Sequence, residues 1–142
     1  MRDTKFRLFN KHDKKMYIYD PKWGNFGQGG GWVGGVLLED YEREGRTFAP
    51  SNQWQLEPEG CEWMEYIGLL DKNDKEIYEG DIVDLYKNQG EALFCRTLTT
   101  VIKWSETGLN WNIWPPHNDN EFWKVISNIY ENPELLNNGV TA

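Results

Sequence analysis

The second half of the chain alternates short β-forming runs with clusters of turn residues, and this alternation limits the folds open to it. Asp, Asn, Gly and Pro, which favour turns, separate the runs. Several short strands at this spacing are typical of a small barrel or a curled sheet. We therefore predict a mainly β fold with a minor α component. The runs are Trp63–Leu69, Ile77–Tyr86, Ala92–Trp104, Leu109–Trp114 and Phe122–Tyr130.

The first half of the chain predicts a β-hairpin followed by less regular structure. Phe6–Phe9 and Met16–Tyr19 favour strands, and a polar turn lies between them. Leu37–Glu44 favours a short helix. Trp54–Leu56 favours a brief strand inside a loop that contains proline.

The end of the chain predicts a short C-terminal helix. Asn132 is a good N-cap residue, and Pro133 suits the first helical position. We divide the chain into an N-terminal hairpin and loop region, residues 1–60, and a C-terminal region, residues 61–142. We expect the two regions to share one compact unit.

A glycine-rich segment, Trp23–Val36, holds seven glycines in fourteen residues. This composition predicts a flexible loop or a hairpin tip. The segment formally fits GxGxxG, but it lacks the preceding strand and following helix that a dinucleotide site needs. Its Trp23, Phe26 and Trp32 are large aromatic side chains, which often anchor protein contacts. We predict that these three residues contact a partner.

The net charge of −8 argues against a general affinity for nucleic acid. Residues 1–16 carry six basic and two acidic side chains, whereas residues 39–81 carry thirteen acidic and four basic ones. A phosphate-binding surface is usually basic, and only the first segment could supply one. An acidic surface suits solubility or a basic protein partner.

The stretch Asp71–Val83 is unusually charged, with seven charged side chains in its first eleven residues. It fails as a calcium loop, because Glu76 stands where the loop needs glycine and Ile82 where it needs glutamate. It succeeds as a turn, because Asp71 can bond to its own backbone. Gly80 can then supply a positive-φ bend or a bulge before the next strand.

Glu76, Glu79 and Asp81 could alternatively form a catalytic carboxylate set. Acid–base chemistry needs two carboxylates in different environments, and a short turn does not provide this. We interpret the charges as a solvated turn beside a strand, in which Asp81 accepts backbone hydrogen bonds.

The remaining candidate residues carry no motif for metal binding or catalysis. His12, His117, Cys61 and Cys95 lack the spacing of a zinc site, although a Cys–His pair that meets in space stays open. We therefore predict no cofactor, no metal and no enzymatic activity. Cys95 lies within a β-forming run and is interpreted as a small core residue. Four tryptophans are expected to fill the barrel core and rim: Trp104, Trp111, Trp114 and Trp123.

The apolar runs of the chain are too short to span a membrane, which bears on where the protein is located in the cell. The charged N-terminus also lacks the apolar stretch of a signal peptide. We expect a cytosolic protein with reduced thiols and no membrane association.

Three blocks of the chain resemble the YopX family of phage and prophage proteins. The first runs from Lys5 to Met16. The second, Tyr66–Val83, includes Gly68, Asp71, Glu79, Gly80 and Asp81, with Asp74 where the family usually has Gly. The third runs from Val125 to Leu136 and includes Asn132 and Pro133. The resemblance implies a phage-encoded, mainly β protein in the cytoplasm of a bacterial host, whose C-terminal half is similar to an SH3-like barrel. These shared residues are expected to be structural, and no catalytic residue carries over.

Together these observations favour a non-enzymatic accessory protein that binds a host or phage protein. A second copy of the same chain is another candidate partner. The alternatives are a nucleic-acid-associated barrel module and an acidic decoy of a nucleic-acid-binding protein.

Overall fold

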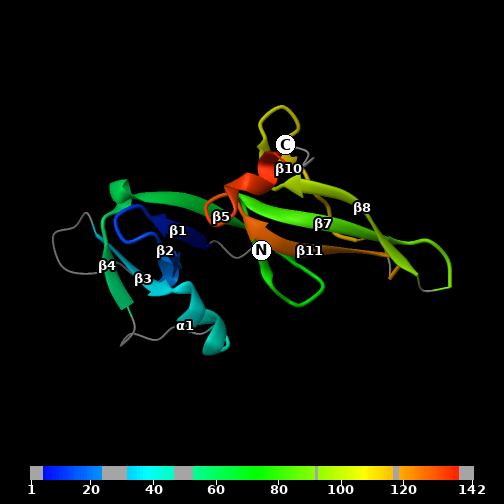
Figure 1. Cartoon of the computed structure of the whole chain (residues 1–142). Helices are drawn as coiled ribbons and strands as arrows, with labels where there is room; N and C mark the ends of the chain where they lie inside the picture. Colours follow the sequence, from blue (N-terminus) through cyan, green and yellow to red (C-terminus); the bar gives the residue numbers. More distant parts are fainter. Residues whose placement is uncertain (1–4, 24–31, 47–52, 92, 117–118, 138–142) are drawn as a thin grey trace. The chain divides into compact units, whose positions relative to one another are not determined.

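The computed structural model describes residues 5–23, 32–46, 53–91, 93–116 and 119–137. It confirms the mainly β fold, and Figure 1 shows the elements coloured along the chain. The chain divides into two compact units, Met1–Tyr66 and Ile67–Ala142, called unit 1 and unit 2 here. The boundary falls inside strand β5 (Cys61–Leu70), a few residues beyond the division proposed from the sequence. Over the described residues, no helix has both the length and the apolar character needed to cross a membrane.

Unit 1 is built on the hairpin predicted at the N-terminus. Strands β1 (Phe6–Asn10) and β2 (Lys15–Tyr19) pair antiparallel, with Leu8 opposite Tyr17. On its other side β1 pairs with the first half of β5. This hairpin is confirmed. The sheet order is β4-β3-β2-β1-β5, and it continues along β5 to β6 (Glu76–Tyr78).

Strand β3 (Val33–Leu37) corrects the prediction that the glycine-rich segment is loop up to Val36. It pairs with β2 and with β4 (Gln53–Leu56), and Val33 and Val36 are buried. Glycine suits this position because a Cβ on Gly35 would meet the end of the Leu56 side chain, which would have to shift, and would lie 3.2 Å from the Cβ of Tyr17. Seven glycines suggested loop, yet in β3 glycine allows close packing across the strands. Residues 24–31 of the segment lie outside the described residues.

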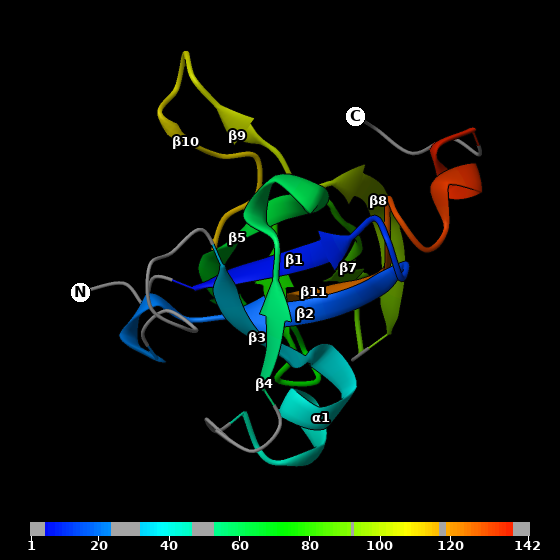
Figure 2. The same ribbon diagram turned by 90° about the vertical axis from the view of Figure 1, so that its left-hand side faces the viewer.

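Helix α1 (Leu38–Arg43) confirms the helix predicted between Leu37 and Glu44. It packs beside β2 and β3, as Figure 2 shows, and buries Tyr41. The described part of the unit also contains short 3-10 helices, η1 (Pro21–Trp23) and η3 (Pro58–Gly60). The core consists of residues from β1 to β5: Leu8, Tyr17, Tyr19, Val33, Leu56 and Cys61.

Unit 2 contains a three-stranded antiparallel sheet in the order β11-β7-β8. Its strands are β7 (Asp81–Asn88), β8 (Phe94–Val101) and β11 (Glu121–Asn128), and a small hairpin pairs β9 (Trp104–Ser105) with β10 (Asn110–Trp111). The central strand β7 is buried over its first five residues. The antiparallel β architecture is thus shown, and the SH3-like barrel stays a prediction.

The run predicted as one strand from Ile77 to Tyr86 is divided by a turn at Glu79 and Gly80, which separates β6 from β7. Gly80 has a φ of 87°, the left-handed conformation expected from the sequence. Its N–H donates to the carbonyl of Ile102, and its carbonyl accepts from the N–H of Ile129. The turn is therefore bonded to two distant parts of unit 2.

The four tryptophans expected in the core and rim lie both in the core and at the surface, whereas the expectation that Cys95 is a core residue is wrong. Trp123 is buried and Trp111 packs partly against the core. Trp104 and Trp114 are exposed, and the ring of Trp114 contacts that of Trp123. Cys95 is exposed, because β8 lies at the edge of its sheet. The buried core residues come from strands and from the loops that follow them: Ile67, Ile77, Val83, Leu85, Ile102, Ile113 and Trp123.

The C-terminal helix is a 3-10 helix, η4 (Pro133–Asn137), which begins at the predicted proline. The carbonyl of Asn132 accepts from the N–H of Leu135. The Asn132 side-chain oxygen accepts from the hydroxyl of Ser127, and its amide donates to Glu134. This second bond lowers the pKa of the Glu134 carboxyl.

Candidate binding site

The carboxylate of Asp71 is a structural element. Its Oδ1 accepts from the N–H groups of Asn73 at 2.8 Å and Lys75 at 2.9 Å, which closes the turn. Its Oδ2 accepts from the N–H of Val125 in β11 at 3.0 Å. Asp71 is buried, whereas the turn residues after it are exposed. The solvated turn predicted here is correct for the tip and wrong for Asp71.

Two further carboxylates of the charged run are also buried, contrary to the expected solvation. Glu76 accepts from the hydroxyl of Tyr78 at 3.1 Å. Asp81, which is 0% exposed, accepts from the N–H of Tyr78 at 2.9 Å, as its predicted role requires. Glu79 is half-buried. These bonds satisfy backbone and hydroxyl donors within the fold, which is a structural use of the charges.

The described residues can be compared with the arrangement that a metal site requires. Within those residues, no group of three or more His, Cys, Asp or Glu side chains is arranged to hold an ion. Cys61 is buried and Cys95 is exposed, and both are free thiols. Burial and the nearby Asp13 carboxylate raise the pKa of the Cys61 thiol, which disfavours the reactive thiolate.

The structure describes only part of the set of predicted contact residues in the glycine-rich segment. Trp23 ends the short helix η1, and Phe26 lies outside the described residues. Trp32 is 42% exposed and lines a pocket of about 470 Å³ beside η3. The other lining residues of that pocket are Glu57, Pro58 and Glu59.

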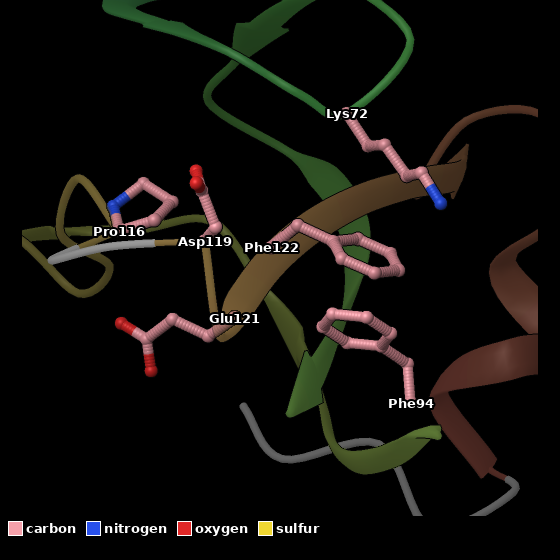
Figure 3. Close-up of a pocket in the computed structure, with 6 residues that line it drawn as sticks. All are labelled: Lys72, Phe94, Pro116, Asp119, Glu121 and Phe122. Atoms are coloured by element: carbon pink, nitrogen blue, oxygen red, sulfur yellow. The ribbon is translucent and has the colours of Figure 1, made fainter. Parts of the chain in front are cut away.

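Unit 2 carries a second pocket, of about 500 Å³, which we call the aromatic pocket. Phe94 opens β8 and Phe122 lies in β11, so two strands of one sheet supply its aromatic wall. Figure 3 shows these two rings beside one another. Pro116, Asp119 and Glu121 lie on the other side of the view, and the carboxylate of Glu121 points away from the rings. Its lining residues are Lys72, Phe94, Pro116, Asp119, Glu121 and Phe122.

The aromatic wall of this pocket is a stack built by strand register. Phe122 lies opposite Tyr86 in the β11–β7 pair, and their rings stack with centroids 4.9 Å apart and planes 13° apart. Phe94 tilts against Phe122 with centroids 5.3 Å apart. Such ring pairs stabilise one another beyond the area that they bury. The wall is therefore formed by rings from three strands that pack on one another.

The charges of the aromatic pocket lie at opposite ends. The ammonium of Lys72 lies 4.2 Å from the ring centroid of Phe122, which is close cation–π contact. Asp119 and Glu121 supply two carboxylates. The carboxylate of Glu121 accepts from the indole N–H of Trp114 at 3.4 Å, and the carbonyl of Trp114 accepts from Trp123 at 2.8 Å. The site can thus hold a group that is both apolar and charged.

Comparison with known proteins shows which family has this architecture. A family model described as YopX protein matches residues 5–137. The chain belongs to the YopX family. The crystal structure of protein EF1440 from Enterococcus faecalis is similar to this fold, with a TM-score of 0.51 and 21% sequence identity. The match covers 96% of this chain and 99% of that chain, and it supports the fold alone. No curated protein matches the chain.

The blocks that resembled the YopX family contain residues with special backbone conformations. Gly68 has a φ of 88° and Gly80 a φ of 87°. Asp74 has a φ of 62°, and Asp is among the residues that tolerate this region. The second block therefore contains three positions whose positive φ restricts which residue types fit them.

The aromatic pocket of this YopX protein was missed by the sequence analysis. Apart from Lys72, its lining residues lie outside the three blocks. The signal that could have found it is the pairing of Tyr86 with Phe122, which requires the register between β7 and β11. That register spans turns of uncertain length, so the sequence alone could not supply it.

Proposed function

We propose that this YopX protein is a non-enzymatic phage or prophage accessory protein that binds another protein, of host or phage origin, in the bacterial cytoplasm. The observation that carries the proposal is the aromatic pocket. It combines exposed ring surface, a charged rim and a rigid strand scaffold, which are the features of protein-binding hot spots. The acidic net charge of −8 favours a basic partner surface.

The buried carboxylates support binding over catalysis. Asp71 and Asp81, which could have served as general acids or bases, accept backbone N–H bonds within the fold. A catalytic carboxylate needs to reach a substrate proton, and these two groups are buried.

Nucleic-acid binding is the alternative, because an aromatic stack on a β surface can also hold bases. Such sites pair their rings with basic side chains that follow the phosphates. Among the lining residues that the structure describes, Asp119 and Glu121 accompany one lysine, Lys72. Their carboxylates would repel a phosphate backbone, which favours a protein partner.

The test is affinity capture from phage-infected or induced cells with the tagged full chain, followed by mass spectrometry and by reconstitution with the purified captured protein. We expect Asp119→Lys and Phe94→Ser to lose the partner. Glu106→Lys is the matched control, because this exposed residue lies in the β9–β10 turn outside the pocket lining. Nuclease treatment of the lysate separates direct protein binding from bridging by nucleic acid. Equal loss of the partner in all three variants would contradict the proposal.

A further inference from the structure

We infer that the aromatic pocket binds an arginine side chain of the protein partner. This inference rests on the proposed function and names the chemistry of its ligand. It starts from the combination of two carboxylates, Asp119 and Glu121, with the rings of Phe94 and Phe122 in one pocket. Glu121 already accepts from the indole N–H of Trp114, and Asp119 is exposed. The two negative charges would repel an anion and attract a cation.

The guanidinium group fits both halves of this lining. It is planar and stacks on aromatic faces, and its fork of N–H donors matches carboxylates. The rings of Phe94 and Phe122 are half-buried. Tyr86 stacks on Phe122, and the Lys72 ammonium lies over the same ring. Phe94 is therefore the ring with a face left for a guanidinium. The pocket volume of about 500 Å³ leaves room for the backbone beside the arginine as well. A lysine ammonium would gain the charge but not the planar stacking.

The side chain of Lys72 shows that Phe122 already attracts a cation. Its ammonium lies 4.2 Å from the ring centroid. The Lys72 ammonium would repel a guanidinium that enters the pocket, because both groups are positively charged. Lys72 therefore weakens the binding of the arginine that we infer. Removing the lysine charge should therefore strengthen arginine binding. The same change would weaken the binding of a phosphate or a carboxylate. Removing the Lys72 charge should therefore change the affinity for cationic and anionic ligands in opposite directions.

The probe is a capped pentapeptide with one arginine flanked by glycines, titrated into the ¹⁵N-labelled full chain at low ionic strength. Citrulline replaces arginine in the matched control peptide, because it keeps the planar shape without the charge. The indole N–H of Trp114, which donates to Glu121, is the reporter signal. A third peptide carries lysine. We expect the arginine peptide to bind about twofold to fivefold more tightly than either control, the range of exposed ion pairs.

Three variants complete the test. Asp119→Asn should weaken arginine binding, Lys72→Met should strengthen it, and Glu106→Gln, outside the pocket lining, should leave it unchanged. Equal binding of the citrulline peptide, no binding of any peptide, or weaker binding after Lys72→Met would each overturn the inference. If any of these three results occurs while the binding of captured partners still requires Phe94, the proposed function stands and only the inference of an arginine ligand is overturned. If the arginine peptide binds but no captured protein depends on the pocket, the proposed function fails.

Discussion

The carboxylate of Asp71 accepts a hydrogen bond from the backbone N–H of Val125 at 3.0 Å, across 54 positions of sequence. The same carboxylate closes its own turn through Asn73 and Lys75. One side chain thereby links the end of β5 to the middle of β11.

Asp71→Ala should destabilise the protein by about 1–3 kcal/mol, because three backbone N–H groups would lose the carboxylate that accepts from them. Chemical denaturation followed by tryptophan fluorescence measures this change. Lys75→Ala is the control in the same turn, since its side chain is exposed, and it should cost less than about 0.5 kcal/mol. Similar losses for both variants would show that Asp71 does not support the turn.

Gly80→Val should destabilise the protein by about 1–3 kcal/mol, because a β-branched residue is strained at positive φ. The matched substitution is Gly45→Val, where φ is 76° but an added Cβ would have no atom within 4 Å. Gly80 is buried and bonded to Ile102 and Ile129, so its variant should unfold at the lower temperature. Equal melting temperatures would contradict a packing role for this turn.

Gly35→Ala should destabilise unit 1 by about 1–3 kcal/mol, the usual cost of overpacking. The added Cβ would collide with Leu56 across the β3–β4 pair. In a double-mutant cycle, Leu56→Ala should cost less in the Gly35→Ala background than in the parent chain. Additive effects would mean that the two residues do not compete for the same space.

Serine at Trp23, Phe26 and Trp32 together should preserve the melting temperature and abolish association with a partner or with a second copy of the chain. Trp32 is exposed, so its loss should not open the core. Thermal unfolding and light scattering after size exclusion measure the two effects. A large drop in melting temperature at unchanged mass would place these aromatics in the core.

The phenol of Tyr17 should make the protein less stable in alkali. Burial first, and then its hydrogen bond to the Asp13 carboxylate at 2.5 Å, raise the pKa of Tyr17. In the unfolded chain the phenol loses its proton above about pH 10, whereas the folded chain retains it. Stability should therefore fall as the pH rises beyond that value. Tyr17→Phe should show a shallower decline in denaturant unfolding, and an unchanged slope would contradict this origin.

The elements that sequence reasoning found are those fixed by local chemistry. The β1–β2 hairpin follows from two apolar runs around a polar turn, and α1 precedes Gly45, which has a φ of 76°. Gly80 could be assigned a positive φ because it follows a turn and precedes a strand. Each of these features depends on a few neighbouring residues.

The features that sequence reasoning missed depend on distant partners. Strand β3 pairs with β2 and with β4, which comes far later in the chain, and Gly35 lies close to the Leu56 side chain there. Asp71 is buried because its second acceptor atom meets Val125. The aromatic pocket needs the β7–β11 register, and Phe94 joins it from β8. No local pattern contains this information.

The bonds of Gly80 also affect how the protein can be made. Its N–H can donate to Ile102, and its carbonyl can accept from Ile129, only when those residues are present. The hydrogen bonds of the turn can therefore form only after β8 and β11 have been synthesised. A ribosome adds roughly 5–20 residues per second, which leaves the charged turn and the start of β7 without these partners for several seconds. The charges of Lys72, Asp74 and Lys75 would keep this nascent segment hydrated during that interval, when an apolar turn would be open to aggregation.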